Sequence, residues 1–80
     1  MSVRVRYFAA AKAALGRGAD EFDDVPDLGA LEARLIASTP DAAPVLARCT
    51  YLVGGVSTTD RATPLASDAA VDVLPPFAGG

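Results

Sequence analysis

Few side chains in this sequence could act as a nucleophile, a general base or a metal ligand. Histidine is absent from the 80 residues, and Cys49 is the only cysteine. Ser38, Ser57 and Ser67 therefore have no histidine to activate them, which excludes a Ser-His-acid hydrolase. A single cysteine excludes an internal disulfide and a cysteine-based zinc site, and we expect Cys49 to be a small buried hydrophobic residue. The side chains predict neither an active site nor a metal site.

The carboxylate that follows Gly79 and Gly80 is the remaining group that could react. Glycine has no Cβ, so a Gly-Gly end can enter a channel that is too narrow for other residues. A free carboxylate is a poor electrophile, but ATP would convert it into an acyl-adenylate that a sulfur or amine nucleophile can attack. Pro75 and Pro76 restrict φ and favour an extended tail. The alternative is a frayed end without a function.

The composition is that of one globular domain in a reducing compartment. Hydrophobic residues make up 51% of the chain, and 80 residues leave no room for a second core. The net charge of −3 argues against nucleic acid as a partner. Arg4 and Arg6 interrupt the first apolar residues, so no signal peptide is predicted, and no apolar run is long enough for a membrane span. We expect a cytoplasmic protein with no membrane partner.

Hydrophobic periodicity predicts four strands. Val3, Val5 and Tyr7 alternate with arginines, which indicates a half-buried strand with these three residues on its core face. The segment "ADEFDDV" is typical of a weaker, exposed edge strand. The segment "TYLVGGV" from Thr50 predicts a third strand with Gly54-Gly55 loosening its end, and "STTDRATPL" then predicts a turn and a short extended chain. The segment "AVDVL" predicts a last strand that leads into the two prolines.

The pattern also predicts one main helix and two short helical pieces. Asp27 can cap a helix in which Leu28, Leu31 and Leu35 share one face, and Thr39-Pro40 ends it. The segment "AAAKAALG" favours a short helix after the first strand. The segment "PDAAPVLARC" predicts a helical turn before the third strand.

This order of elements predicts an α+β fold of the β-grasp, or ubiquitin-like, type. One main helix can cover one face of a mixed sheet of four to five strands, with the first and last strands in the middle. We expect the domain over residues 1–75 and an extended reactive tail over residues 76–80. Phe8 and Leu74 fall by parity on the uncovered face, where they suggest a docking surface. Alternatively, both are covered by the tail or a loop.

Three segments resemble the small sulfur-carrier subunit of molybdopterin synthase, the MoaD-like family. They are "VRVRYFAAAKAALG" at the start, "LGALEARL" in the main helix and "VDVLPPFAGG" at the end, and the last is the most specific. The resemblance covers nearly the whole chain. Two loops depart from the family pattern: "SDAAV" from Ser67 lacks a turn glycine and one acid, and "VGGVST" stands where a Val-Asn-Gly-like turn is usual.

The resemblance implies that Gly80 is the site of adenylation and thiocarboxylate formation, with Gly79 beside it. A ubiquitin-activating-type adenylyltransferase would use ATP, and a sulfurtransferase or cysteine desulfurase would supply the sulfur. The large subunit of molybdopterin synthase would then receive the tail, and the sulfur would enter the dithiolene of molybdopterin. The carrier would be a non-catalytic subunit with no permanently bound cofactor. The implied partner-binding residues are Phe8, Leu74, Pro76 and Phe77.

Three other functions stay open. The first is a sulfur carrier for thiamin thiazole or cysteine synthesis, although thiamin carriers tend to lack the helix that "AAAKAALG" predicts. The second is a ubiquitin-like protein modifier that is conjugated to lysines through Gly80. The third is a β-grasp binding module with an inert tail.

Overall fold

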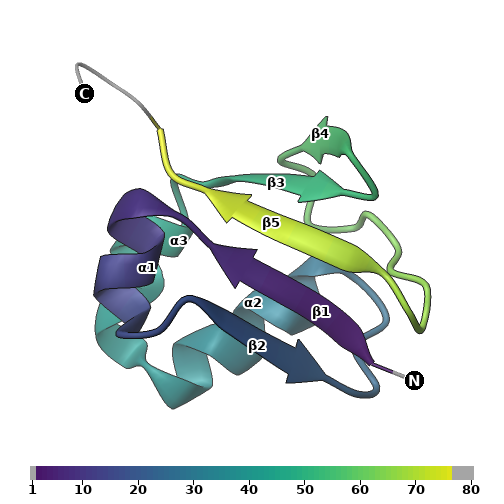
Figure 1. Ribbon diagram of the computed structural model, residues 1–80, viewed down its shortest axis with the longest axis horizontal. Helices are drawn as coiled ribbons and strands as arrows, with labels where there is room; N and C mark the ends of the chain where they lie inside the picture. Colours follow the sequence, from purple (N-terminus) through teal and green to yellow (C-terminus); the bar gives the residue numbers. More distant parts are fainter. Residues whose placement is uncertain (1, 77–80) are drawn as a thin grey trace.

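The protein consists of a mixed five-stranded sheet with its main helix packed on one face. The computed structural model describes residues 2–76. The strand order is β2-β1-β5-β3-β4 (Figure 1). This is the α+β, β-grasp arrangement that the sequence predicts. Along the chain the elements are β1 (Val3–Tyr7), α1 (Ala9–Leu15), β2 (Ala19–Phe22), α2 (Leu28–Ser38), the 3₁₀ turn η1 (Pro40–Ala42), α3 (Ala43–Leu46), β3 (Thr50–Val53), β4 (Val56–Thr58) and β5 (Ala70–Leu74).

The first and last strands lie side by side in the middle of the sheet, as predicted. β1 and β5 run parallel, with Val5 opposite Val71 and Tyr7 opposite Val73. β2 pairs with the other edge of β1 and β3 with the other edge of β5, both antiparallel. Successive side chains of a strand point to opposite faces. Val3, Val5 and Tyr7 accordingly point into the core, where each is at most 2% exposed.

Helix α2 supplies the apolar layer that covers this face of the sheet. Leu28, Leu31 and Leu35 are fully buried, as their spacing predicts. The predicted cap at Asp27 is confirmed, because its Oδ1 accepts a hydrogen bond of 2.8 Å from the Ala30 amide. A side-chain acceptor at this position satisfies one of the free N–H groups in the first helical turn.

The loop after β4 holds the start of α2 in place. The amides of Leu28 and Gly29 donate to the carbonyl groups of Thr63 and Arg61, at 3.1 and 2.8 Å. The Arg61 guanidinium also donates to the Glu32 carboxylate at 2.8 Å, one turn further along the helix. The loop therefore replaces solvent as the partner of the helix N-terminus and fixes the helix against the sheet.

Replacing Asp27 with alanine is expected to lower the free energy of unfolding by about 1 kcal/mol, because the Ala30 amide loses its acceptor. Urea denaturation followed by circular dichroism measures the change. Asp27→Asn is the matched control, since its side-chain oxygen can still accept the bond, and it should stay close to the original protein. Equal losses in the two variants would show that the cap oxygen is not what stabilises the helix.

The two short helical pieces are also confirmed. α1 ends at Gly16, whose φ of +74° is a left-handed angle that favours glycine at this position. η1 and α3 together form the short helical segment before β3, with Pro44 in the first turn of α3. The segment from η1 to α3 packs against α1, which closes one end of the core.

The chain after β3 is more regular than the sequence predicts. Gly54 and Gly55, which were expected only to loosen the strand, form a tight turn with φ values of +57° and +84°. Such left-handed angles belong to two-residue hairpin turns and favour glycine. The following residues, Val56–Thr58, pair with β3 as a separate strand, β4, whereas the sequence predicts Val56 at the end of the third strand and a turn from Ser57.

The second strand is shorter than predicted. β2 ends at Phe22, whereas the pattern of alternating residues suggested a strand that reaches Val25. Asp24 has a φ of +59°, which turns the chain away from the sheet edge. Val25 is nevertheless buried, at 5% exposure, because the turn directs it back into the core.

Candidate functional site

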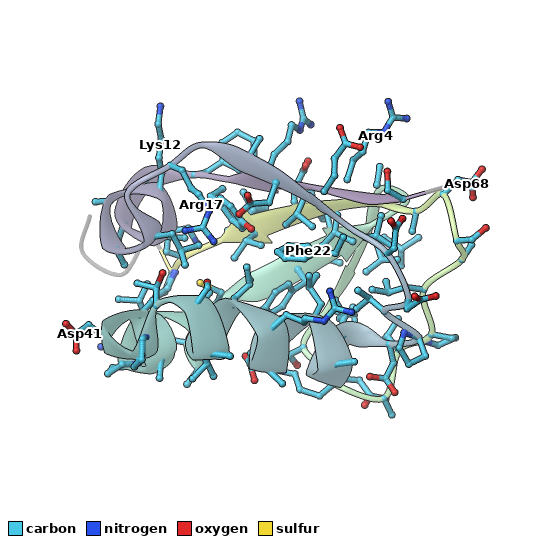
Figure 2. All side chains as sticks on the ribbon, turned by 90° about the horizontal axis from the view of Figure 1, so that it is seen from below. Arg4, Lys12, Arg17, Phe22, Asp41 and Asp68 are labelled. Atoms are coloured by element: carbon cyan, nitrogen blue, oxygen red, sulfur yellow. The ribbon has the colours of Figure 1, made fainter. Side chains whose placement is uncertain are left out.

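The face of the sheet that is turned away from α2 is the candidate functional surface, and we call it the open face. Figure 2 shows α2 below the sheet, with the side chains of Arg4 and Lys12 pointing away on the other side. The residues of the open face alternate with the core residues of each strand. By strand register they are Arg4, Arg6, Phe8, Ala19, Glu21, Thr50, Leu52, Ser57, Ala70, Asp72 and Leu74.

One end of the open face is apolar. Phe8 and Leu74 follow the paired residues Tyr7 and Val73, so they stand at the same end of two parallel neighbouring strands. The Phe8 amide donates to the Val73 carbonyl at 3.2 Å, which holds the two chain segments together. Phe8 is 38% exposed and Leu74 is half-buried. Leu52 adds a further half-buried apolar side chain to this face.

The chain leaves the sheet at this apolar end. Pro75 is buried and Pro76 is exposed, so the chain passes from the core to the surface between the two prolines. The structure thus brings Phe8, Leu74 and Pro76 to one end of the sheet. The other functional residues expected from the sequence lie outside the described residues: Phe77, Gly79 and Gly80.

The middle of the open face holds an ion pair that sequence reasoning missed. Arg6 on β1 donates to both carboxylate oxygens of Asp72 on β5, each at 2.9 Å. The hydrogen bond to Asp72 raises the pKa of Arg6 above its ordinary value, so the guanidinium stays charged. It also lies 5.5 Å from the centroid of the Phe8 ring, within the range of a cation–π contact. The alternation of apolar and polar residues in β1 and β5 places Arg6 and Asp72 on the open face. Only the parallel register of the two strands brings these two side chains together.

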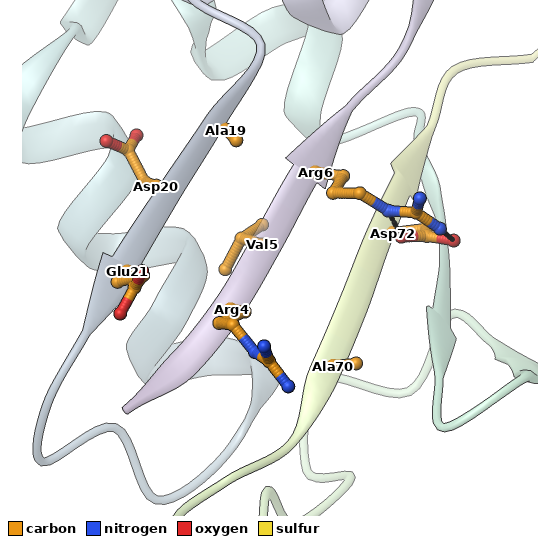
Figure 3. Close-up of a pocket in the computed structure, with 8 residues that line it drawn as sticks. All are labelled: Arg4, Val5, Arg6, Ala19, Asp20, Glu21, Ala70 and Asp72. Carbon is orange, nitrogen blue, oxygen red and sulfur yellow. Dashed lines mark hydrogen bonds and ion pairs between the residues drawn. The ribbon is translucent and has the colours of Figure 1, made fainter. Parts of the chain in front are cut away.

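The far end of the open face is hollowed. Figure 3 shows the hollow between the Arg4 and Arg6 side chains, with the small side chains of Ala19 and Ala70 beside them. Its volume is about 570 Å³. Ala19 lies opposite Arg6 and Ala70 lies opposite Arg4, so each arginine has a methyl group as its neighbour on one side. Because the side chains of Ala19 and Ala70 are small, the guanidinium groups of Arg4 and Arg6 rise above their neighbours.

The Cys49 thiol and the aromatic rings of Tyr7 and Tyr51 are part of the core. Cys49 is 2% exposed, as expected, and its thiol donates to the Val45 carbonyl at 3.2 Å. Burial raises the pKa of the Cys49 thiol, which lowers the fraction of reactive thiolate. Burial likewise raises the pKa values of Tyr7 and Tyr51, whose hydroxyl groups donate to Asp20 and Glu32. These groups pack in the core, where their hydrogen bonds stabilise the fold.

Among residues 2–76, no cluster of three or more acidic, cysteine or histidine side chains is arranged to hold a metal ion. None of the helices in this part of the chain combines the length and the apolar character needed to cross a membrane.

Sequence comparison alone identifies no relative. No protein-family model matches the chain. No curated protein matches it either.

Comparison with solved structures finds proteins of the same fold. SAMP1, the small archaeal modifier protein 1 of Haloferax volcanii, has a TM-score of 0.81 at 19% identity, with 100% of both chains covered. Putative molybdopterin converting factor subunit 1 of Pyrococcus furiosus also has a TM-score of 0.81, at 17% identity over 96% of this chain and 99% of that one. A complex of subunits 1 and 2 of the molybdopterin-converting factor of Helicobacter pylori contains a chain with a TM-score of 0.72 at 24% identity, with full coverage of both chains.

These structures confirm the resemblance at the level of the fold. The neighbours are a small archaeal modifier protein and chains of molybdopterin-converting factors, and they share the fold of this chain over 96 to 100% of its length. At identities of 17 to 24% they show how the chain folds. They also show that one chain of this fold assembles with a second subunit in Helicobacter pylori.

Proposed function

We propose that this protein is a sulfur carrier, the small subunit of a molybdopterin synthase. In this function the carboxylate of Gly80 is adenylated with ATP by a ubiquitin-activating-type enzyme. A persulfide on a sulfurtransferase or cysteine desulfurase then displaces AMP to form an acyl disulfide, and a second thiol cleaves this disulfide to leave the thiocarboxylate. The large subunit receives the tail and uses the sulfur to build the dithiolene of molybdopterin. We place these steps in the cytoplasm, where ATP and thiols are available.

The observation that supports this proposal most directly is the position at which the central strand, β5, ends. β5 lies between β1 and β3, so its backbone is hydrogen-bonded on both sides up to the end of the sheet. It passes through the buried Pro75 to the exposed Pro76. The segment that follows therefore starts from one of the most firmly held points of the fold. A partner that docks beside Phe8 and Leu74 would meet the tail at a defined position.

Two further facts support the proposal. Burial raises the pKa of the Cys49 thiol, so this side chain is a poor nucleophile. The fold is shared with a subunit 1 that forms a complex with subunit 2 of a molybdopterin-converting factor. A protein that works through its main-chain end and an open face needs no active site of its own.

A ubiquitin-like modifier is the second candidate. Its support is the equally close structural match to SAMP1 of Haloferax volcanii, a small archaeal modifier protein. The same adenylate would then be attacked by a lysine amine instead of sulfur, and the product would be an isopeptide. A carrier for thiamin thiazole or cysteine synthesis would also form the thiocarboxylate, but it would transfer the sulfur to a different acceptor.

Intact-mass spectrometry of the protein isolated from its own cells tests these functions. We expect the mass increase that results when sulfur replaces one oxygen atom of the terminal carboxylate. Conjugates of higher mass, joined through Gly80, would favour the modifier. Only the free carboxylate, in cells with an active activating enzyme, would contradict both. Co-purification with a pterin-binding large subunit would separate the molybdopterin pathway from the thiamin and cysteine pathways.

A further inference from the structure

Lys12 is the only lysine of the chain, and it lies on α1, beside the end of the sheet where β5 stops. We propose that the Lys12 amine is an internal acceptor for the activated carboxyl group of Gly80, so that an amide bond joins the two residues within one chain and closes a ring. This inference rests on the proposed function, because it starts from the adenylate of Gly80. It adds an acceptor site that competes with sulfur.

The start of α1 holds Lys12 close to the end of β5. The Phe8 amide donates to the Val73 carbonyl at 3.2 Å, and the Phe8 carbonyl accepts a bond of 3.4 Å from the main-chain amide of Lys12. Two backbone hydrogen bonds thus link β5 to the first turn of α1. The helix also packs against β5, and Figure 1 shows it beside the end of this strand. Lys12 therefore has a defined place relative to the point where the chain leaves the sheet.

The side chain of Lys12 is accessible. It is exposed, and Figure 2 shows it pointing away from α2, on the side of the open face. Within residues 2–76, no acidic side chain forms an ion pair with it. Its stem lies over Gly18, where an added Cβ atom would be 3.5 Å from the Lys12 Cε atom. Exposed side chains change rotamer within nanoseconds, so the amine is not confined to this position.

The segment after β5 is long enough to reach Lys12. Leu74 and Phe8 follow paired residues of neighbouring strands, which lie about 4.8 Å apart. One helical turn of about 5.4 Å separates Phe8 from Lys12, so the main chain of Lys12 is about 10 Å from Leu74. Six peptide units connect Leu74 to Gly80, and they span at most about 20 Å. The chain length therefore exceeds the gap about twofold, before the lysine side chain is counted.

The other nitrogen groups of the chain are poorer acceptors. All remaining basic side chains are arginines, whose guanidinium groups stay charged and are not nucleophilic. The α-amino group precedes β1, and Val3 at the start of β1 is about 16 Å along the strand from Phe8. Because β5 runs parallel to β1, it ends far from Val3. Of the two primary amines of the chain, Lys12 is the one on the element beside the end of β5.

The reaction is an acyl transfer without a redox step. The neutral Lys12 amine attacks the carbonyl carbon of the Gly80 adenylate, so that a C–N bond forms and the C–O bond to the phosphate breaks. AMP leaves with the electron pair of that bond, and the nitrogen loses a proton to solvent. Relative to the free chain, the product lacks one molecule of water. Its Gly80 carboxyl group has become an amide and can no longer receive sulfur.

Attachment to the same chain favours Lys12 over a lysine of another molecule. A short linker gives the second group an effective concentration in the millimolar range, roughly a thousandfold above that of an amine on a second copy at micromolar concentration. We therefore expect ring closure to be the main fate of the adenylate when no sulfur donor is present. With a donor, thiocarboxylate formation should prevail, because sulfur is the stronger nucleophile.

Activation without a sulfur donor tests the proposal. The full chain is incubated with ATP and the purified activating enzyme of the same organism, and intact mass reports the loss of one water. Proteolysis should then yield a branched peptide that joins Lys12 to Gly80. Lys12→Arg keeps the positive charge but removes the amine, so the yield of ring should fall at least about tenfold. Exchange of pyrophosphate into ATP measures activation, and the yield is expressed per activated chain.

A matched control moves the lysine while keeping the net charge and the number of amines. Lys12→Arg combined with Arg34→Lys places the amine on the exposed side of α2, in the opposite layer, and should form no ring. Equal ring yields in this double variant and the original protein would overturn the inference. Pyrophosphate exchange without any loss of water would overturn it as well, and both outcomes would leave the proposed function intact.

Two further outcomes are distinct from these. A product with the mass of two chains minus one water would assign Lys12 to conjugation between copies and overturn the ring. If the original protein supported neither pyrophosphate exchange nor thiocarboxylate formation, the proposed function would fail and this inference with it.

Discussion

Removing Gly80 is expected to abolish sulfur transfer completely while leaving the thermal stability of the protein unchanged. The proposed reaction takes place at the carboxylate of Gly80, and the shortened chain ends one residue earlier, on Gly79. Among the described residues, the buried ones lie between Val3 and Pro75, several positions before Gly80. The shortened chain should therefore keep its core. Formation of the thiocarboxylate by the purified activating enzyme, ATP and a sulfur donor is measured by intact mass.

The control for this experiment separates the position of the carboxylate from the identity of the residue. Gly80→Ala keeps the length of the tail and adds one methyl group, so it tests whether the channel of the partner requires glycine. The shortened chain and the Gly80→Ala variant should both melt at the temperature of the original protein. If the chain without Gly80 still supported synthesis of the cofactor, the proposed tail mechanism would be wrong.

Leu31→Ala is expected to lower the free energy of unfolding by about 3 kcal/mol. Leu31 lies in the middle of α2, is fully buried and has no solvent-facing side. Truncating a buried leucine removes its apolar contacts and leaves a cavity, at a cost of roughly 2–5 kcal/mol. Small domains have total stabilities near the lower end of about 5–15 kcal/mol, so this is a large fraction. Urea denaturation of the two proteins measures the difference.

Ala33→Ser on the exposed side of the same helix is the matched control. It alters helix propensity by about 0.5 kcal/mol and removes no buried contact. The Leu31→Ala variant should still undergo thiocarboxylate formation at low temperature, because the tail is not part of the core. A loss of less than about 1 kcal/mol would mean that the core relaxes around the cavity, and α2 would contribute less to stability than its burial indicates.

The fold was predictable because its main signals are local. The alternation of Val3, Val5 and Tyr7 determines which face of β1 is buried, and the spacing of the leucines does the same for α2. The same alternation places Phe8 and Leu74 on the open face. Leu52 could have been found by this rule as well, since its neighbour Tyr51 is a core residue.

The parts that could not be predicted depend on pairing between distant residues. Strand β4 has only three residues, and Gly54-Gly55 alone does not reveal whether the chain returns as a strand or as a loop. The Arg6–Asp72 pair joins residues 66 positions apart, and it exists only because β1 and β5 are parallel and in this register. The hollow beside Arg4 depends on the same register, because Ala19 and Ala70 are brought to it from two other strands.

The parallel pairing of β1 and β5 also links completion of the sheet to the order of synthesis. The ribosome makes β5 last of the five strands, yet this strand joins β1 and β2 on one side to β3 and β4 on the other. Such long-range pairing makes the sheet close late, after both halves have been translated. A product that stops before β5 therefore has no closed sheet and also no Gly-Gly end. If Gly80 is activated as proposed, only chains long enough to form the complete sheet would carry the residue that reacts.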